Sequence, residues 1–193
     1  MPELVWYAAY GSNMHVDRFL LYLEGGRAPG RSRVEAGARD PAPPRESTPC
    51  VISHALGFQG WSKWWGGGVC FVDPDRSDAT TLCRRYLVTG EQFADVMAQE
   101  SGRVVGDPVD LSAVVRHGEA VVGPGRYDRA ILVDEVDDVP VVTFTAAQSV
   151  GEMEFNPPSP AYAATIVEGL MRAHGLNHDQ ARTYIHEAWI AWG

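Results

Sequence analysis

One carboxylate has an unusual position in the sequence. The segment from residue 89 reads TGEQFADVMAQESG, and Thr89 and Gln92 have the spacing of a capping box, which predicts a helix start. Glu100 follows the apolar Val96 and Met97 by four and three residues, so we expect it on the buried face of that helix. Burial and the helix C-terminus both favour the protonated carboxyl. Glu100 is therefore a candidate general acid and base, unless the helix ends early and leaves it in solvent.

A second candidate for chemistry is a turn near the N-terminus. Residues 7–14, YAAYGSNM, begin as an apolar strand and then break into Gly11, Ser12 and Asn13. Gly11 permits a tight bend, and Ser12 and Asn13 are good caps for a following helix. The first N–H groups of that helix have no intrahelical partner, so the turn could bind a carboxylate, a phosphate or an oxyanion. A plain capped turn is the alternative, and the pattern is not a Walker A loop.

Charge and composition restrict the class of partner. The net charge is 16 − 25 = −9, which argues against nucleic acid and anionic membranes but allows an anionic small molecule in a locally positive pocket. No apolar run approaches the roughly 20 residues of a membrane span. The N-terminus lacks a basic region followed by an apolar core, so we expect a cytoplasmic protein.

The residues that commonly bind metals or form disulfides show no such pattern. Cys50, Cys70 and Cys83 lack CxxC spacing, so we interpret them as thiols in a reducing compartment. The six histidines form no HExxH motif. An acidic segment at residues 134–138 is typical of a solvated hairpin. The sequence thus predicts no metal site and no cofactor.

The order of the elements predicts the fold class. Strands come first, short helices are inserted between them, and two helices end the chain, with Ser159 and Gly175 as the expected caps of the first. We therefore expect one domain over residues 1–193, of the α+β class, with short helices packed around a small, mixed, β-barrel-like sheet. Residues 25–49 are rich in proline and arginine and predict a long loop, either a solvated excursion or an arginine-bearing lid over a polar substrate.

Taken together, these motifs resemble the γ-glutamylcyclotransferase-like family, which includes γ-glutamylamine cyclotransferases and AIG2-like proteins. The family's Tyr-Gly-Ser-Asn signature matches residues 10–13, and its helical glutamate matches Glu100 in AQESG. Three further matches follow in the family's order: WWGGGV at 64–69, GRY at 125–127 and PPSPAY at 157–162. Phe144 stands where glutathione-pathway members carry tyrosine.

The resemblance implies a reaction and a set of site residues. In the family's reaction, the α-amine of a γ-glutamyl amide attacks its own γ-carbonyl, which releases 5-oxoproline and an amine or amino acid, without metal or cofactor. Glu100 would be the general acid and base. The implied substrate-binding residues are Tyr10, Gly11, Ser12, Asn13, Met14, Gly67, Tyr127 and Tyr162.

The alternatives are an amide hydrolase or acyltransferase of secondary metabolism on the same scaffold, or a non-catalytic protein that binds a carboxylate-bearing metabolite. In each enzymatic case the expected partner is a small carboxylate-bearing molecule, and the oligomeric state stays open between monomer and homodimer.

Overall fold

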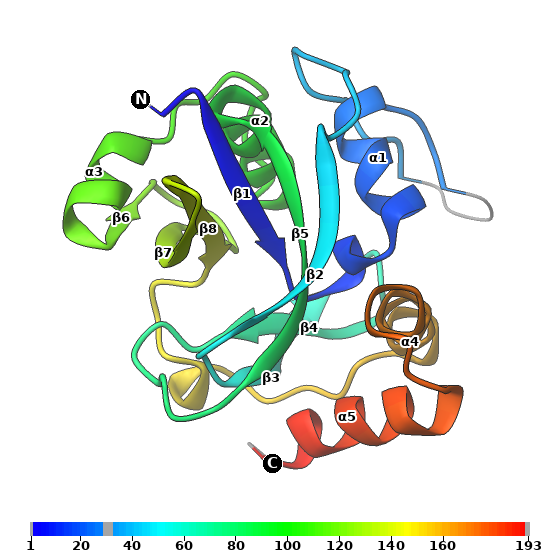
Figure 1. The fold of residues 1–193 in the computed structure, drawn as a ribbon. Helices are drawn as coiled ribbons and strands as arrows, with labels where there is room; N and C mark the ends of the chain where they lie inside the picture. The colour runs from blue at the N-terminus through cyan, green and yellow to red at the C-terminus, as the bar shows by residue number, and fades with distance from the viewer. Residues whose placement is uncertain (1, 29–32, 192–193) are drawn as a thin grey trace.

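The computed structural model describes residues 2–28 and 33–191, and its centre is a mixed six-stranded sheet (Figure 1). The strand order is β2-β5-β1-β8-β7-β6. These strands are β1 (Leu4–Ala9), β2 (Glu46–Ile52), β5 (Thr81–Thr89), β6 (Glu119–Val121), β7 (Arg129–Val136) and β8 (Val139–Thr145). The central β1 pairs antiparallel with β5 and parallel with β8. The expected α+β class with a mixed sheet is confirmed.

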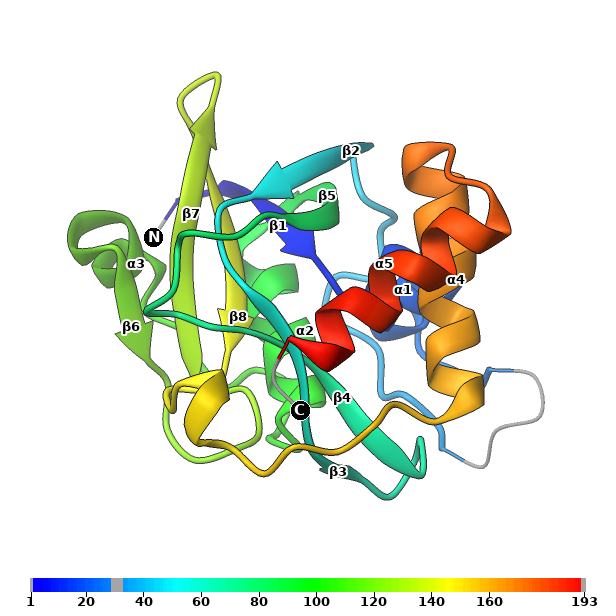
Figure 2. The ribbon, with the colours of Figure 1, turned by 90° about the horizontal axis from the view of Figure 1, so that it is seen from below.

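A separate hairpin crosses the end of the sheet. It consists of β3 (Leu56–Ser62) and β4 (Gly67–Val72), which pair only with each other among the named strands. Thr145, the last residue of β8, donates a hydrogen bond to the Val72 carbonyl at the end of β4, at 2.5 Å. The hairpin is thereby joined to the sheet near the point where β1 ends (Figures 1 and 2).

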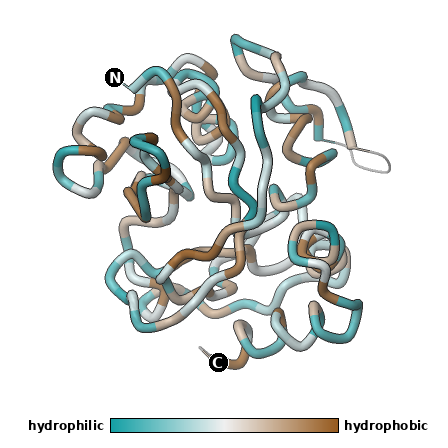
Figure 3. The backbone as a smooth tube through the Cα atoms, viewed as in Figure 1, coloured by the Kyte–Doolittle hydropathy of each residue, from teal (hydrophilic) through white to brown (hydrophobic). Residues whose placement is uncertain are grey.

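Within the described residues, five α-helices surround the strands. They are α1 (Val16–Glu24), α2 (Gly90–Glu100), α3 (Leu111–His117), α4 (Pro160–His174) and α5 (His178–Ile190), with short 3-10 turns η1 (Ser12–Met14) and η2 (Val150–Glu152). Helices α1, α4 and α5 lie together on one side of the molecule, whereas α3 and β6 lie on the other (Figure 2). Hydrophobic stretches follow the central strands, and much of α5 is hydrophilic (Figure 3).

Local sequence signals explain where several elements begin and end. Thr89 and Gln92 form the expected capping box at the start of α2. The side chain of Ser159 caps α4, Pro160 occupies its first turn, and Gly175 ends it in the left-handed conformation. These predictions are confirmed. They could be made from the sequence because each depends on contacts within a few residues.

A close approach between α4 and η1 depends on a glycine. A Cβ atom built on Gly169 would lie 2.8 Å from the Cβ of Met14 and 3.0 Å from the backbone nitrogen of His15. Real Cβ atoms do not approach other carbons so closely, so only glycine lets α4 pack against this turn. The C-terminal helices therefore fix the position of a turn near the N-terminus.

The loop predicted at 25–49 ends earlier in the structure, because β2 begins at Glu46. Pro49 is accommodated within this strand because β2 lies at the edge of the sheet and pairs only with β5. Pro29 and Arg31 of this loop lie outside the described residues.

The described part of the loop is not a solvated excursion. The fully buried carboxylate of Asp95 on α2 accepts hydrogen bonds from the backbone nitrogen of Arg39, at 2.9 Å, and from its side chain. Gln92 donates to the Ala42 carbonyl at 2.8 Å, and Gln99 accepts from the Gly37 nitrogen at 3.1 Å. The loop is therefore held against the helix that carries Glu100.

Within the ranges 2–28 and 33–191, no helix has the length and apolar character that crossing a membrane requires.

Candidate active site

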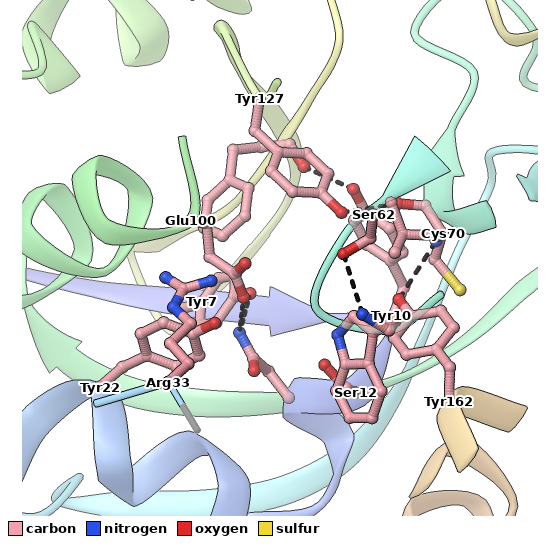
Figure 4. Close-up of a pocket in the computed structure, with 15 residues that line it drawn as sticks. Tyr7, Tyr10, Ser12, Tyr22, Arg33, Ser62, Cys70, Glu100, Tyr127 and Tyr162 are labelled. Atoms are coloured by element: carbon pink, nitrogen blue, oxygen red, sulfur yellow. Dashed lines mark hydrogen bonds between the residues drawn. The ribbon is translucent and has the colours of Figure 1, made fainter. Parts of the chain in front are cut away.

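Glu100 and the Gly11–Asn13 turn face one pocket (Figure 4). Residues from β1, η1, α1, β4 and α2 contribute to the wall of this pocket. It is lined by Tyr7, Tyr10, Gly11, Ser12, Asn13, Tyr22, Arg33, Ser62, Trp65, Val69, Cys70, Glu100, Tyr127, Phe144 and Tyr162.

Glu100 is half-buried at the last residue of α2 and is held by an amide rather than by a cation. The side-chain nitrogen of Asn13 donates to Glu100 Oε1 at 3.0 Å, and the same nitrogen lies 3.3 Å from the hydroxyl oxygen of Tyr7. Throughout the described chain, no lysine, arginine or histidine nitrogen lies within the 4.0 Å of an ion pair with Glu100. The carboxylate is therefore oriented but not neutralised.

The prediction that Ser12 and Asn13 cap the following helix is wrong. Residues 12–14 form the 3-10 turn η1, which has no side-chain cap, and His15 precedes α1 without a side-chain cap. The Asn13 side chain instead donates through Nδ2 to Glu100, and Oδ1, the atom with which a cap would accept, has no hydrogen-bond partner among the described residues. Tyr86 holds this turn by donating to the Asn13 carbonyl at 2.7 Å.

Two tyrosines fix the backbone of β4 on the opposite wall. Tyr127 donates to the carbonyl of Cys70 at 3.1 Å, and the Cys70 amide donates to the Tyr162 hydroxyl at 3.1 Å. The Tyr162 hydroxyl would lie only 3.0 Å from a Cβ atom on Gly11, so a larger residue there would displace it. Tyr10 donates to the Phe144 carbonyl at 2.7 Å. The wall is therefore rigidly organised by hydroxyl groups.

The tyrosines near Glu100 stay neutral at physiological pH. Burial raises the pKa of Tyr7, Tyr22 and Tyr127 well above the ordinary value, and the negative charge of Glu100 raises each of them further. These phenols therefore serve as neutral hydrogen-bonding groups and do not compete with Glu100 for the role of base.

A buried acid held by two arginines stands beside the pocket. Glu35 is 4% exposed, and its carboxylate accepts from Arg18 at 2.8 Å and from Arg33 at 2.9 Å. Arg18 also donates to the hydroxyl of Tyr22 at 2.6 Å. Two guanidinium groups and one carboxylate leave one positive charge in excess at this edge. Arg33 lies beside Glu100 and Tyr22, across the pocket from Cys70 and Tyr162 (Figure 4).

The structure brings most, but not all, of the predicted site residues together. Tyr10, Gly11, Ser12, Asn13, Tyr127, Tyr162 and Glu100 line the pocket. Met14, the last residue of η1, is fully buried and contributes no lining surface. Gly67 also lies outside the pocket lining. A Cβ atom at this position would come within 2.7 Å of the Pro157 carbonyl oxygen, so the glycine allows the two backbone segments to pack closely.

Several lining residues were not predicted. Arg33 lies in the loop for which an arginine-bearing lid was one interpretation, so the sequence carried a partial signal for it. Tyr7 and Tyr22 lie inside apolar segments, where a tyrosine is expected to be a core residue. Nothing in their spacing distinguishes a tyrosine that lines a pocket from one that packs in the core.

In the ranges that the structure describes, no three side chains of the metal-binding types gather as ligands of one ion would.

The fold defines the structural class of the protein. The structure superposes on a γ-glutamyl cyclotransferase with a TM-score of 0.52, at 16% identity, over 96% of this chain and 86% of the other. It superposes equally well on an uncharacterised human protein, with a TM-score of 0.51 at 18% identity and the same coverage. At these identities the similarity establishes that the chain has the γ-glutamyl cyclotransferase fold.

The sequence comparison adds one relative with a different name. The chain is 37% identical over 202 residues to Histone deacetylase 5 of Arabidopsis thaliana, a match that spans 95% of the chain but 30% of that protein's length. No protein-family model matches the sequence. The name therefore describes a much longer protein, of which this chain resembles one part.

Proposed function

We propose that the chain cleaves a γ-glutamyl amide by attack of the substrate's own α-amine, releasing 5-oxoproline and an amine or amino acid. The observation that carries the proposal is the hydrogen bond from Asn13 to Glu100 in the pocket lined by the Gly11–Asn13 turn. The shared fold with a γ-glutamyl cyclotransferase supports the same reaction.

Two acceptors in the pocket suit the ammonium group of such a substrate. The Oδ1 atom of Asn13 is buried and has no hydrogen-bond partner among the described residues. A buried acceptor without a partner costs stability, so a bound donor there is favourable. Glu100 accepts from Asn13 through Oε1, which leaves Oε2 for the ligand. An α-ammonium between these two oxygens would satisfy both and would compensate the charge of Glu100.

The proton transfers follow from that position. Glu100 takes a proton from the ammonium, and the neutral amine attacks the γ-carbonyl carbon to close a five-membered ring. The resulting oxyanion is stabilised by hydrogen-bond donors, for which the first N–H groups of η1 are suited because they have no partner within that turn. Glu100 then returns this proton to the leaving nitrogen, and the amide C–N bond breaks. The ring nitrogen loses its second proton to the departing amine, which leaves as an ammonium ion, so no proton is consumed overall.

Recognition of the substrate carboxylate has a local electrostatic basis. The chain carries a net charge of −9, yet the cluster of Arg18, Glu35 and Arg33 leaves one positive charge beside the pocket. A γ-glutamyl compound also brings its nucleophile within reach of the carbonyl, so holding it folded supplies much of the acceleration.

The test is a screen of γ-glutamyl amino acids, γ-glutamylamines and glutathione, with 5-oxoproline as the measured product. Release of 5-oxoproline by the purified chain supports the proposal. Release of free glutamate would instead indicate an amide hydrolase, and saturable binding without turnover would indicate a non-catalytic binding protein.

The name of the plant relative adds one arm to this screen. An acetylated lysine peptide should be included, with release of acetate as the readout. We expect no acetate release above that of buffer, because the proposed reaction needs an amine on the acyl group itself, and an acetyl group has none. Turnover of that peptide without 5-oxoproline release from any γ-glutamyl compound would contradict the proposal.

A further inference from the structure

A second pocket adjoins the candidate active site at Glu100. It shares Glu100 and Arg33 with the first pocket, and it is otherwise bounded by Trp64, Arg126 and the end of α2. We call it the outer pocket. Trp64 comes from the turn between β3 and β4, and Arg126 precedes β7, so two separate loops meet here.

Arg126 gives the outer pocket a positive charge that no ion pair among the described residues neutralises. The residue is half-buried, and its Nη2 donates to the Trp61 carbonyl oxygen at 2.8 Å. In the part of the chain that the structure describes, no carboxylate lies within 4.0 Å of its guanidinium nitrogens. Arg33, by contrast, is paired with Glu35 and donates to the Gln99 carbonyl at 3.0 Å.

The position of Glu100 determines which part of the substrate reaches the outer pocket. In the proposed reaction, Glu100 must contact both the α-nitrogen and the leaving nitrogen. If the glutamyl part lies in the first pocket against the Gly11–Asn13 turn, the leaving group must still stay in contact with Glu100. The outer pocket is also lined by Glu100, so it can receive that leaving group.

We propose that the outer pocket binds a leaving amine that carries a carboxylate, and that Arg126 determines this specificity. The inference rests on the proposed function. A leaving amine departs as an ammonium ion, which a lone guanidinium repels; a carboxylate on the same molecule reverses that interaction. The guanidinium of Arg33 lies 5.8 Å from the ring centroid of Trp64, whose side of the pocket offers an apolar wall for the rest of an amino acid.

The test compares two substrates that differ only in the carboxylate: γ-glutamyl-norvaline and γ-glutamyl-butylamine. We expect Arg126→Gln to lower kcat/KM for the norvaline amide by about tenfold, as for a partly exposed arginine–carboxylate pair, and to change that of the butylamine amide less than about threefold. Arg126→Lys should recover part of the loss, because it keeps the charge. Arg45→Gln is the matched control: Arg45 is exposed and belongs to neither pocket.

The outcomes separate this inference from the proposed function. Equal losses for both substrates, or no loss for either, would overturn the role of Arg126 while 5-oxoproline release still supported the reaction. If the wild-type chain did not release 5-oxoproline from any γ-glutamyl amide, the proposed function would be wrong, and the inference about Arg126 would be wrong as well. A thermal melt of each variant checks that loss of the Arg126 hydrogen bond to Trp61 has not unfolded the loop.

Discussion

Replacing Glu100 by glutamine tests the proposed mechanism most directly. The substitution keeps the shape of the side chain, and a glutamine oxygen can still accept the hydrogen bond that Asn13 donates to Glu100 at 3.0 Å. No ion pair among the described residues is lost. Exchanging a charge-assisted hydrogen bond for a neutral one costs about 1 kcal/mol, so the melting temperature should fall by only a few degrees.

The effect on turnover should be far larger. Loss of a general acid and base lowers kcat by about 10²–10⁴-fold. Part of that loss comes from the nucleophile, because the substrate's α-amine is mostly an ammonium ion at pH 7 and Glu100 no longer takes its proton. The residual rate of Glu100→Gln should therefore rise from pH 7 to pH 9, as more of the amine loses its proton in solution.

The assay measures 5-oxoproline release at saturating substrate for wild type, Glu100→Gln and Glu24→Gln. Glu24 is a matched control because it too is the last residue of a helix, α1, but is exposed and lies outside both pockets. A kcat for Glu100→Gln within tenfold of wild type would refute the role of Glu100. An equal loss in Glu24→Gln would show that removal of a charge, rather than of the base, is responsible.

Three other properties can be checked independently. Gly169→Ala should lower both the melting temperature and 5-oxoproline release despite the better helix propensity of alanine, because its Cβ would collide with Met14 of η1. An unchanged melting temperature would contradict this close packing. Burial lowers the pKa of His174 below 6.5, so near pH 6.5 the unfolded chain takes up a proton that the folded chain does not. The stability that depends on neutral His174 is therefore present above that pH and lost as the pH falls. Between pH 7.5 and 5.5 the melting temperature should fall less steeply in His174→Gln than in wild type. Iodoacetamide should modify Cys50 before the other cysteines, as detected by mass spectrometry. The neighbouring Cys83 thiol lowers the pKa of Cys50, whereas burial raises the pKa of Cys70 to about 12. Modification of Cys70 in the folded protein would contradict this order.

Elements with local signals could be predicted closely from the sequence. Strand β5 occupies residues 81–89 with an alternating burial pattern, and the predicted capping box of Thr89 and Gln92 marks the start of α2. These features depend on side-chain alternation and on hydrogen bonds three residues apart, which a single sequence displays. The α+β class followed from the order of such elements.

The errors concern residues whose partners lie far along the chain. Asn13 has the local propensity of a helix cap, but its side chain bonds to Glu100, 87 residues away. Strand β2 starts at Glu46 within a proline-rich segment because an edge position beside β5 tolerates Pro49. The strand neighbours of β1 and the approach of Arg33 to Glu100 likewise depend on tertiary packing, for which one sequence holds no measurable signal.

The close packing of Gly169 on η1 has a consequence for how the pocket forms during folding. Its wall combines residues from both ends of the chain: Tyr10 bonds to the Phe144 carbonyl across 134 positions, and the Cys70 amide bonds to Tyr162 across 92. Contacts of such high sequence separation form late, because closing long loops costs entropy before the contact compensates for it. The pocket is therefore complete only when α4 has docked on η1 and β4, and competence to bind a ligand should appear together with that docking.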